Sequence, residues 1–149
     1  MTTLTTPGHV GLNVTDLARS VEFYRRALGF EQLGMSTDGE HRYAFLGYAG
    51  TLRLTLWQQS NGAFSTATPG LHHLSFQVDG IDEVRAVESV LKELGAAFTH
   101  DGVVAHHEGA TSGGIFFTDP DGIRLEVYTL SGVDAEPAPS GSAPTCGFF

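Results

Sequence analysis

The chain has 149 residues and a mass of 15.9 kDa, which is the usual size of one domain. Its 17 acidic residues against 8 basic residues give a net charge of −9, which disfavours binding to nucleic acid or to an anionic membrane surface. Hydrophobic residues make up 41% and charged residues 17%, so the composition indicates a globular chain with a packed core.

The cysteine content and the termini bear on the cellular compartment. Cys146 is the only cysteine, which excludes an intramolecular disulfide. The start of the chain lacks a basic flank followed by an apolar run, and no apolar stretch is long enough to span a bilayer. We therefore expect a cytoplasmic protein. Residues 131–149 are rich in Pro, Gly, Ser and Ala without periodicity, which predicts a flexible tail.

Two stretches, about 8–58 and about 72–130, repeat one plan. Each opens with a strand-like run that starts with a histidine, 9–14 and 73–78, and continues into a helix-like run, 16–28 and 81–94. The apolar residues of these longer runs form one stripe at helical spacing. Asp16 and Asp82 are candidate N-caps, and Gly29 and Gly95 are candidate helix stops.

Further strands are predicted at 43–47, 52–57, 115–118 and 123–128. Residues 52–57 and 123–128 match position for position as apolar, Arg, Leu, variable, apolar, aromatic, which sets the register between the two modules. The sequence therefore predicts an α+β domain over 1–130 made of two tandem βαβββ modules. We expect a curved mixed or antiparallel sheet around a metal-binding cavity.

Alternation along the predicted strands separates an apolar face from a polar and aromatic face. The apolar set is expected to form the core beneath the helices: Val10, Leu12, Val14, Leu52, Leu54, Leu56, Leu74, Phe76, Val78, Ile123, Leu125 and Val127. The other set carries His, Asn, Arg, Ser, Gln, Glu, Trp and Tyr rather than the Lys and Glu of a plain solvated face. This face predicts a partly sheltered pocket for a small-molecule substrate.

Three side chains of the polar face have metal-ligating chemistry. His9 and His73 occupy equivalent positions of the two modules, and Glu126 lies on the same face. A single strand histidine is more often structural than a ligand, but two equivalent histidines with a carboxylate favour a facial triad. Fe(II) suits this set best, and Mn, Co, Ni or Zn also fits.

These residues resemble the vicinal oxygen chelate superfamily, which contains glyoxalase I, extradiol dioxygenases, methylmalonyl-CoA epimerase, and fosfomycin and bleomycin resistance proteins. The resemblance rests on 9–17, 23–24, 28–30, 70–78 and 117–126, and spans nearly all of 8–130. Its most specific part is the Asp-Pro-Asp-Gly turn at 119–122, four residues before Glu126. The resemblance implies the fold and metal triad described above, and a homodimer.

Within that superfamily, the pattern of His9, His73 and Glu126 is similar to the iron triad of extradiol dioxygenases. Glyoxalase I carries a fourth ligand, a carboxylate, where this chain has Thr55. The dioxygenases also carry an acid/base histidine, which His106 or His107 matches, and a tyrosine where this chain has Phe116. We assign His107 as the candidate acid/base and Tyr128 as a substitute phenol, with Tyr43 as the alternative phenol.

The resemblance thus implies a metal-dependent, extradiol-dioxygenase-like enzyme that acts on a small vicinally oxygenated or aromatic substrate. The candidate substrate-binding residues are Asn13, Arg53, Thr55, Trp57, Gln77 and Phe116. A metal-free protein that sequesters a drug or metabolite, as in bleomycin resistance, is the alternative outside enzymes, because the net charge and the pocket aromatics suit it. A glyoxalase-like or thiol-transferase-like lyase is the alternative within enzymes.

Overall fold

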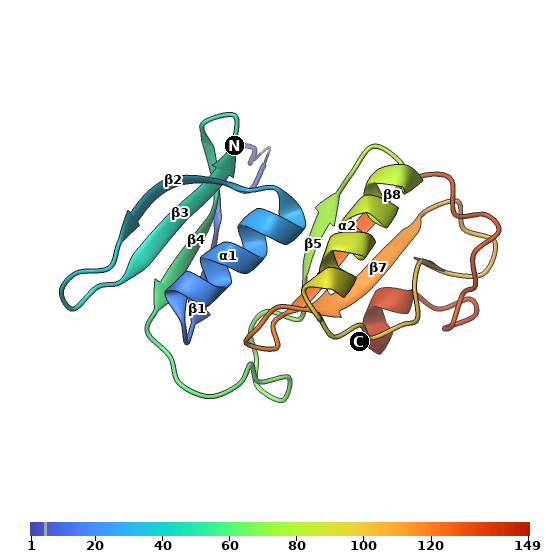
Figure 1. Cartoon of the computed structure of the whole chain (residues 1–149). Helices are drawn as coiled ribbons and strands as arrows, with labels where there is room; N and C mark the ends of the chain where they lie inside the picture. The colour runs from blue at the N-terminus through green and yellow to red at the C-terminus, as the bar shows by residue number, and fades with distance from the viewer. Residues whose placement is uncertain (5) are drawn as a thin grey trace. The chain divides into compact units, whose positions relative to one another are not determined.

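The computed structural model describes residues 1–4 and 6–149. Its contacts divide the chain into two compact units, Met1–Ala63 and Phe64–Phe149. Each unit is described by itself (Figure 1). No helix of the described residues is long and apolar enough to cross a membrane.

The first unit is a four-stranded mixed sheet with one helix against it (Figure 1). Its elements are β1 (Val10–Val14), α1 (Leu17–Leu28), β2 (Glu31–Ser36), β3 (Tyr43–Tyr48) and β4 (Thr51–Gln58). The strand order is β1-β4-β3-β2, in which β1 runs parallel to β4 and the other neighbours are antiparallel.

The second unit repeats this arrangement. Its elements are β5 (Leu74–Gln77), α2 (Ile81–Glu93), β6 (Val104–Ala105), β7 (Gly113–Thr118), β8 (Arg124–Thr129) and the short 3-10 helix η1 (Thr145–Phe148). The strand order is β5-β8-β7-β6, β5 runs parallel to β8, and α2 packs on β8 and β7 (Figure 1). The predicted fold of two tandem βαβββ modules is thereby confirmed.

The register of the parallel pairs is the same in both units. Gly11 of β1 pairs with Thr55 of β4, and Ser75 of β5 pairs with Glu126 of β8. Thr55 and Glu126 therefore occupy equivalent positions, as the match between 52–57 and 123–128 predicts. His9 and His73 each directly precede the first strand of their unit.

The sequence analysis predicts three strands after each helix but gives residue ranges for only two of them. Strands β2 and β6 are the ones that it does not locate. The first half of β2 is exposed and its pairing with β3 contains a register shift, so its side chains show no apolar alternation. Strand β6 has two residues, which is too short for a periodic signal. The other strands start or end within two residues of their predicted limits.

The helix ends follow the predicted capping with one exception. The Asp16 side chain accepts a hydrogen bond from the Arg19 backbone N–H at 3.0 Å, and Gly29 adopts the left-handed conformation at φ 69°. The prediction that Asp82 caps the second helix is wrong. Gly80 is the N-cap of α2, and Asp82 lies in the first turn, where its charge complements the helix dipole.

The core of each unit lies between its helix and its sheet. On β1, β4 and β8 the predicted apolar face is buried at Leu12, Leu54, Leu56, Leu125 and Val127. The apolar residues of β5 are only half-buried, because β5 is at the edge of its sheet.

Hydrogen bonds hold the C-terminal segment, for which the composition predicts flexibility, against the second unit. The Ala105 backbone N–H donates to the Pro137 carbonyl at 2.8 Å, and the Glu108 N–H donates to the Gly141 carbonyl at 2.6 Å. Val133 and Thr145 are fully buried. These contacts place the segment along β6 and the loop that follows it.

Gly114 is required where β7 passes β8. A Cβ atom on Gly114 would overlap the backbone of Val127 and Tyr128. We expect Gly114→Ala to lower the free energy of unfolding by about 1–3 kcal/mol, because a packed backbone cannot yield without strain. Urea denaturation measures the change. Gly147→Ala, whose Cβ would meet nothing within 4 Å, is the control, and equal losses in both variants would contradict the prediction.

Candidate metal site

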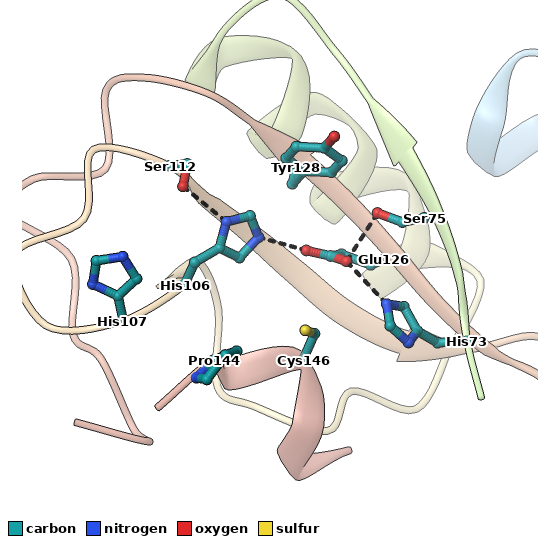
Figure 2. Close-up of a pocket in the computed structure, with 9 residues that line it drawn as sticks. All are labelled: His73, Ser75, His106, His107, Ser112, Glu126, Tyr128, Pro144 and Cys146. Carbon is teal, nitrogen blue, oxygen red and sulfur yellow. Dashed lines mark hydrogen bonds and ion pairs between the residues drawn. The ribbon is translucent and has the colours of Figure 1, made fainter. Parts of the chain in front are cut away.

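The second unit contains a pocket of about 390 Å³. Strands β5 and β8, the loop between β6 and β7, and the C-terminal segment contribute its walls (Figure 2). Its lining residues are His73, Ser75, His106, His107, Ser112, Glu126, Tyr128, Pro144 and Cys146.

The carboxylate of Glu126 lies at the centre of this group of side chains (Figure 2). Its side chain is only 5% exposed. Because β5 and β8 are parallel and in register, Ser75 is its direct neighbour, and the Ser75 hydroxyl donates to Oε2 at 2.8 Å. His73 Nε2 lies 3.5 Å from the same oxygen. Two of the three predicted metal ligands are thus in contact.

The other carboxylate oxygen is bonded to His106. His106 Nε2 lies 2.6 Å from Glu126 Oε1, and His106 Nδ1 lies 2.9 Å from the Ser112 hydroxyl. Because an ionised carboxylate only accepts, Nε2 carries the proton. In the neutral imidazole Nδ1 then accepts, so the Ser112 hydroxyl donates to it.

His107, the predicted acid/base, has a different environment. It is exposed at the pocket and lies apart from the contacts to Glu126 (Figure 2). Its Nδ1 lies 3.1 Å from the Glu108 backbone carbonyl. A carbonyl only accepts, so Nδ1 carries the proton and the neutral ring keeps a lone pair on Nε2. That lone pair can accept a proton.

Burial chiefly lowers the pKa of His73 below its usual value. The Glu126 carboxylate opposes this change, while His72 and Arg124 add to it. His73 Nδ1 also lies 2.8 Å from His72 Nδ1. His73 is therefore neutral at pH 7, which is the protonation state that binds a metal.

The first unit holds the predicted site residues His9, Asn13, Arg53, Thr55 and Trp57. His9 and Arg53 are exposed, and Thr55 is buried. The Trp57 indole N–H donates to the Thr55 hydroxyl at 3.1 Å, and the Asn13 side chain accepts from a backbone N–H at 3.0 Å. These groups share the polar face that the alternation predicts.

Trp57 also belongs to an aromatic cluster on β3 and β4. Its ring centroid lies 5.1 Å from that of Tyr43 and 6.4 Å from that of Phe45. The three rings are half-buried.

The second unit holds the remaining predicted residues. The Tyr128 hydroxyl donates to the Gln77 side chain at 3.0 Å, and these residues are cross-strand partners. Phe116 is fully buried, and its ring lies 5.2 Å from the Phe149 ring and 6.5 Å from the His106 ring.

Within each unit, the described residues contain no group of three His, Cys, Asp or Glu side chains that could hold a metal ion. The predicted triad draws His9 from the first unit and His73 and Glu126 from the second. A site that uses all three stays a prediction.

Some pocket residues carry no sequence signal. Ser75 lies on the polar face of its strand and is found by alternation. Ser112 lies in a loop and Pro144 in the C-terminal segment, where no periodicity places a side chain. Tertiary packing alone brings them to the pocket.

A family model described as the Glyoxalase/Bleomycin resistance protein/Dioxygenase superfamily matches residues 6–127. The chain belongs to this superfamily. The match covers both modules and their connection. The resemblance drawn from the sequence motifs is thereby confirmed.

Named relatives within the superfamily differ in activity. The chain is 32% identical over 127 residues to a lactoylglutathione lyase of Escherichia coli O157:H7, covering 80% of this chain and 88% of the relative. It is 33% identical over 142 residues to a trivalent organoarsenical cleaving enzyme of Bacillus sp. (strain MD1), covering 93% and 80%. A solved glyoxylase/bleomycin resistance protein/dioxygenase domain from Frankia sp. EAN1pec superposes with a TM-score of 0.73 at 28% identity, covering 85% and 98%.

Two half-buried histidines are expected to make stability depend on pH. Burial lowers the pKa of His100 as well as that of His73, and no partner among the described residues bonds the buried Nε2 of His100. The unfolded chain therefore binds more protons below about pH 6.5, and the free energy of unfolding falls as the pH is lowered. We expect His100→Phe to lose less stability than the wild type between about pH 7.5 and about pH 5.

Urea denaturation at both pH values measures this difference. His41→Phe, at an exposed position, is the control and keeps the wild-type dependence. A slope unchanged by His100→Phe would show that His100 titrates alike in the folded and unfolded chains.

Proposed function

We propose that this protein is a divalent-metal-dependent enzyme whose metal is held by His9, His73 and Glu126. We further propose an extradiol-dioxygenase-like reaction with Fe(II), on a small substrate that presents two adjacent oxygens or an aromatic ring. The observation that carries the proposal is the buried Glu126 carboxylate, with the neutral His73 ring 3.5 Å from its Oε2.

The donor set fits such a metal. Imidazole nitrogen and carboxylate oxygen suit Fe(II), and also Mn, Co, Ni and Zn. Burying a carboxylate is costly unless hydrogen bonds or an opposite charge compensate it. Ser75 supplies a neutral donor to Oε2, and a divalent cation beside that oxygen would supply the opposite charge.

The bound metal would supply Lewis-acid stabilisation of negative charge on the substrate oxygens. In this proposal His107 accepts the substrate proton at Nε2, the atom that its hydrogen bond to the Glu108 carbonyl leaves with a lone pair. Tyr128 lines the pocket, and in this proposal it orients the substrate together with its hydrogen-bond partner Gln77. The sequence prediction adds Asn13, Arg53, Thr55, Trp57 and Phe116 as substrate-binding residues.

Thr55 favours the dioxygenase-like reaction over the lyase reaction of the Escherichia coli relative. It occupies the position equivalent to Glu126, where the glyoxalase I resemblance implies a further carboxylate ligand. The Thr55 hydroxyl accepts a hydrogen bond from the Trp57 indole N–H, so this position holds an uncharged side chain that is already hydrogen-bonded within the protein. Three protein ligands leave more open positions than four, as oxygen chemistry requires.

The first test is metal content after anaerobic reconstitution with Fe(II). We expect about one Fe(II) per wild-type chain and nearly none in Glu126→Ala or His9→Ala, because each removes a ligand. Elemental analysis measures the metal, and thermal unfolding shows that the variants fold. Glu108→Ala, which removes an exposed carboxylate beside the pocket, keeps the metal.

Oxygen uptake on a panel of catechols then tests the reaction, and formation of lactoylglutathione tests the lyase alternative. Metal retained in Glu126→Ala would disprove the ligand assignment. A wild type that takes up no metal under any loading would favour metal-free sequestration, for which the Tyr43, Phe45 and Trp57 cluster offers an aromatic surface.

A second candidate substrate class is a trivalent organoarsenical. The relative from Bacillus sp. (strain MD1) carries that activity in its name and covers 93% of this chain. Cys146 lines the same pocket as His73 and Glu126, and its thiol is half-buried (Figure 2). A thiolate is a soft ligand, and trivalent arsenic binds soft ligands.

Release of inorganic arsenic from a trivalent aryl arsenical tests this class. We expect Cys146→Ser to raise KM at least about 10-fold, because the hydroxyl is a poor arsenic ligand. Ser142→Ala, on the same segment, is the control and keeps the wild-type KM. Equal KM values for Cys146→Ser and the wild type would contradict the role of Cys146. No arsenic release by the wild type would exclude this substrate class.

A further inference from the structure

We propose that His106 is a positioning residue that holds the Glu126 carboxylate so that Oε2 is presented to the metal beside His73. This inference rests on the proposed metal function and assigns a role that the sequence prediction does not give to His106. His106 then positions the carboxylate, while its neighbour His107 accepts the substrate proton.

The two oxygens of Glu126 have different environments. Oε1 is taken by His106 Nε2 at 2.6 Å, while Oε2 lies beside His73 Nε2 at 3.5 Å and accepts from the Ser75 hydroxyl at 2.8 Å. A carboxylate held at one oxygen cannot rotate freely about its last bond. The hydrogen bonds from His106 and Ser75 therefore fix the plane of the carboxylate, with one oxygen held by His106 and the other directed toward His73.

Ser112 fixes the direction of this hydrogen bond. Its hydroxyl lies 2.9 Å from His106 Nδ1, and the Ser112 backbone carbonyl accepts the His106 N–H at 3.0 Å. A hydroxyl that donates to Nδ1 favours the tautomer with the proton on Nε2, which is the tautomer that donates to Glu126. With both ring nitrogens engaged, His106 has no lone pair for a substrate proton.

The C-terminal segment fixes the main chain at His106. The Thr145 N–H donates to the His106 carbonyl at 2.7 Å, and the Thr145 hydroxyl donates to the Ala105 carbonyl at 2.8 Å. Thr145 is fully buried, so these bonds are shielded from water. The imidazole ring of His106 also packs near the Tyr128 ring, with 5.3 Å between the two ring centroids. The His106 side chain is therefore held at its backbone, at both nitrogens and on a ring face.

The test compares Mn(II) affinity across matched variants, with free Mn(II) measured by electron paramagnetic resonance. We expect His106→Phe, which keeps a ring but removes the donor, to weaken Mn(II) binding roughly 10–100-fold. His106→Gln restores most of that affinity, because its amide nitrogen can donate from nearly the same place. His107→Phe binds Mn(II) like the wild type.

Turnover separates the two histidines. In the Fe(II)-loaded protein, His107→Phe loses turnover on the substrate found in the panel above while keeping its metal. A general loss of packing would not be rescued by Gln at position 106. Unchanged Mn(II) affinity in His106→Phe, with binding by the wild type intact, would overturn the role of His106 and leave the metal function standing. No Mn(II) binding by the wild type would overturn both.

A metal-free readout covers the case in which His106→Phe does not fold. The ¹⁵N chemical shifts of the His106 ring in the apo wild type are expected to show the proton on Nε2. Ser112→Ala removes the hydroxyl at Nδ1, and we expect the other tautomer to appear and Mn(II) affinity to fall. A wild-type proton on Nδ1, or unchanged shifts and affinity in Ser112→Ala, would overturn the inference.

Discussion

The buried carboxylate of Glu126 is the constraint on which the site depends. A charged group with 5% of its side chain exposed has lost most of its hydration, and the protein must replace it. Ser75, His106 and His73 surround the two oxygens. His73 and Ser75 come from the start of β5 and His106 from the loop after β6, so these two parts of the unit must pack against β8 before the carboxylate is accommodated.

The internal repeat shows how one architecture carries different chemistry in its two copies. The parallel pairing that sets Ser75 beside Glu126 also sets Gly11 beside Thr55. On the antiparallel side, Glu126 pairs with Phe116 of β7, and Thr55 pairs with Phe45 of β3. The first module thus has the uncharged Thr55 at the position where the second module has the buried carboxylate of Glu126. The two modules share the backbone register and differ in the side chains that it places side by side.

The adjacent histidines show how local hydrogen bonds assign chemical roles. His106 and His107 have the same side chain and are neighbours in the chain. The acceptor beside His106 Nε2 is a carboxylate, and the acceptor beside His107 Nδ1 is a backbone carbonyl. Each acceptor decides which nitrogen carries the proton, and so which atom can act as a donor or as a base. The C-terminal segment contributes by holding the backbone of His106 through Thr145.

The sequence by itself determined the two-module fold, because helical and strand periodicities, Asp16, Gly29 and the match between 52–57 and 123–128 are local signals. It also identified Glu126 and His73 as neighbours on one face, because alternation and the repeat register are properties of the chain. The contact between His106 and Glu126, and the presence of Ser112 and Cys146 in the pocket, depended on tertiary structure. These residues lie in loops and in the C-terminal segment, where no period relates sequence position to direction. Only packing against β6, β7 and β8 decides where such side chains lie.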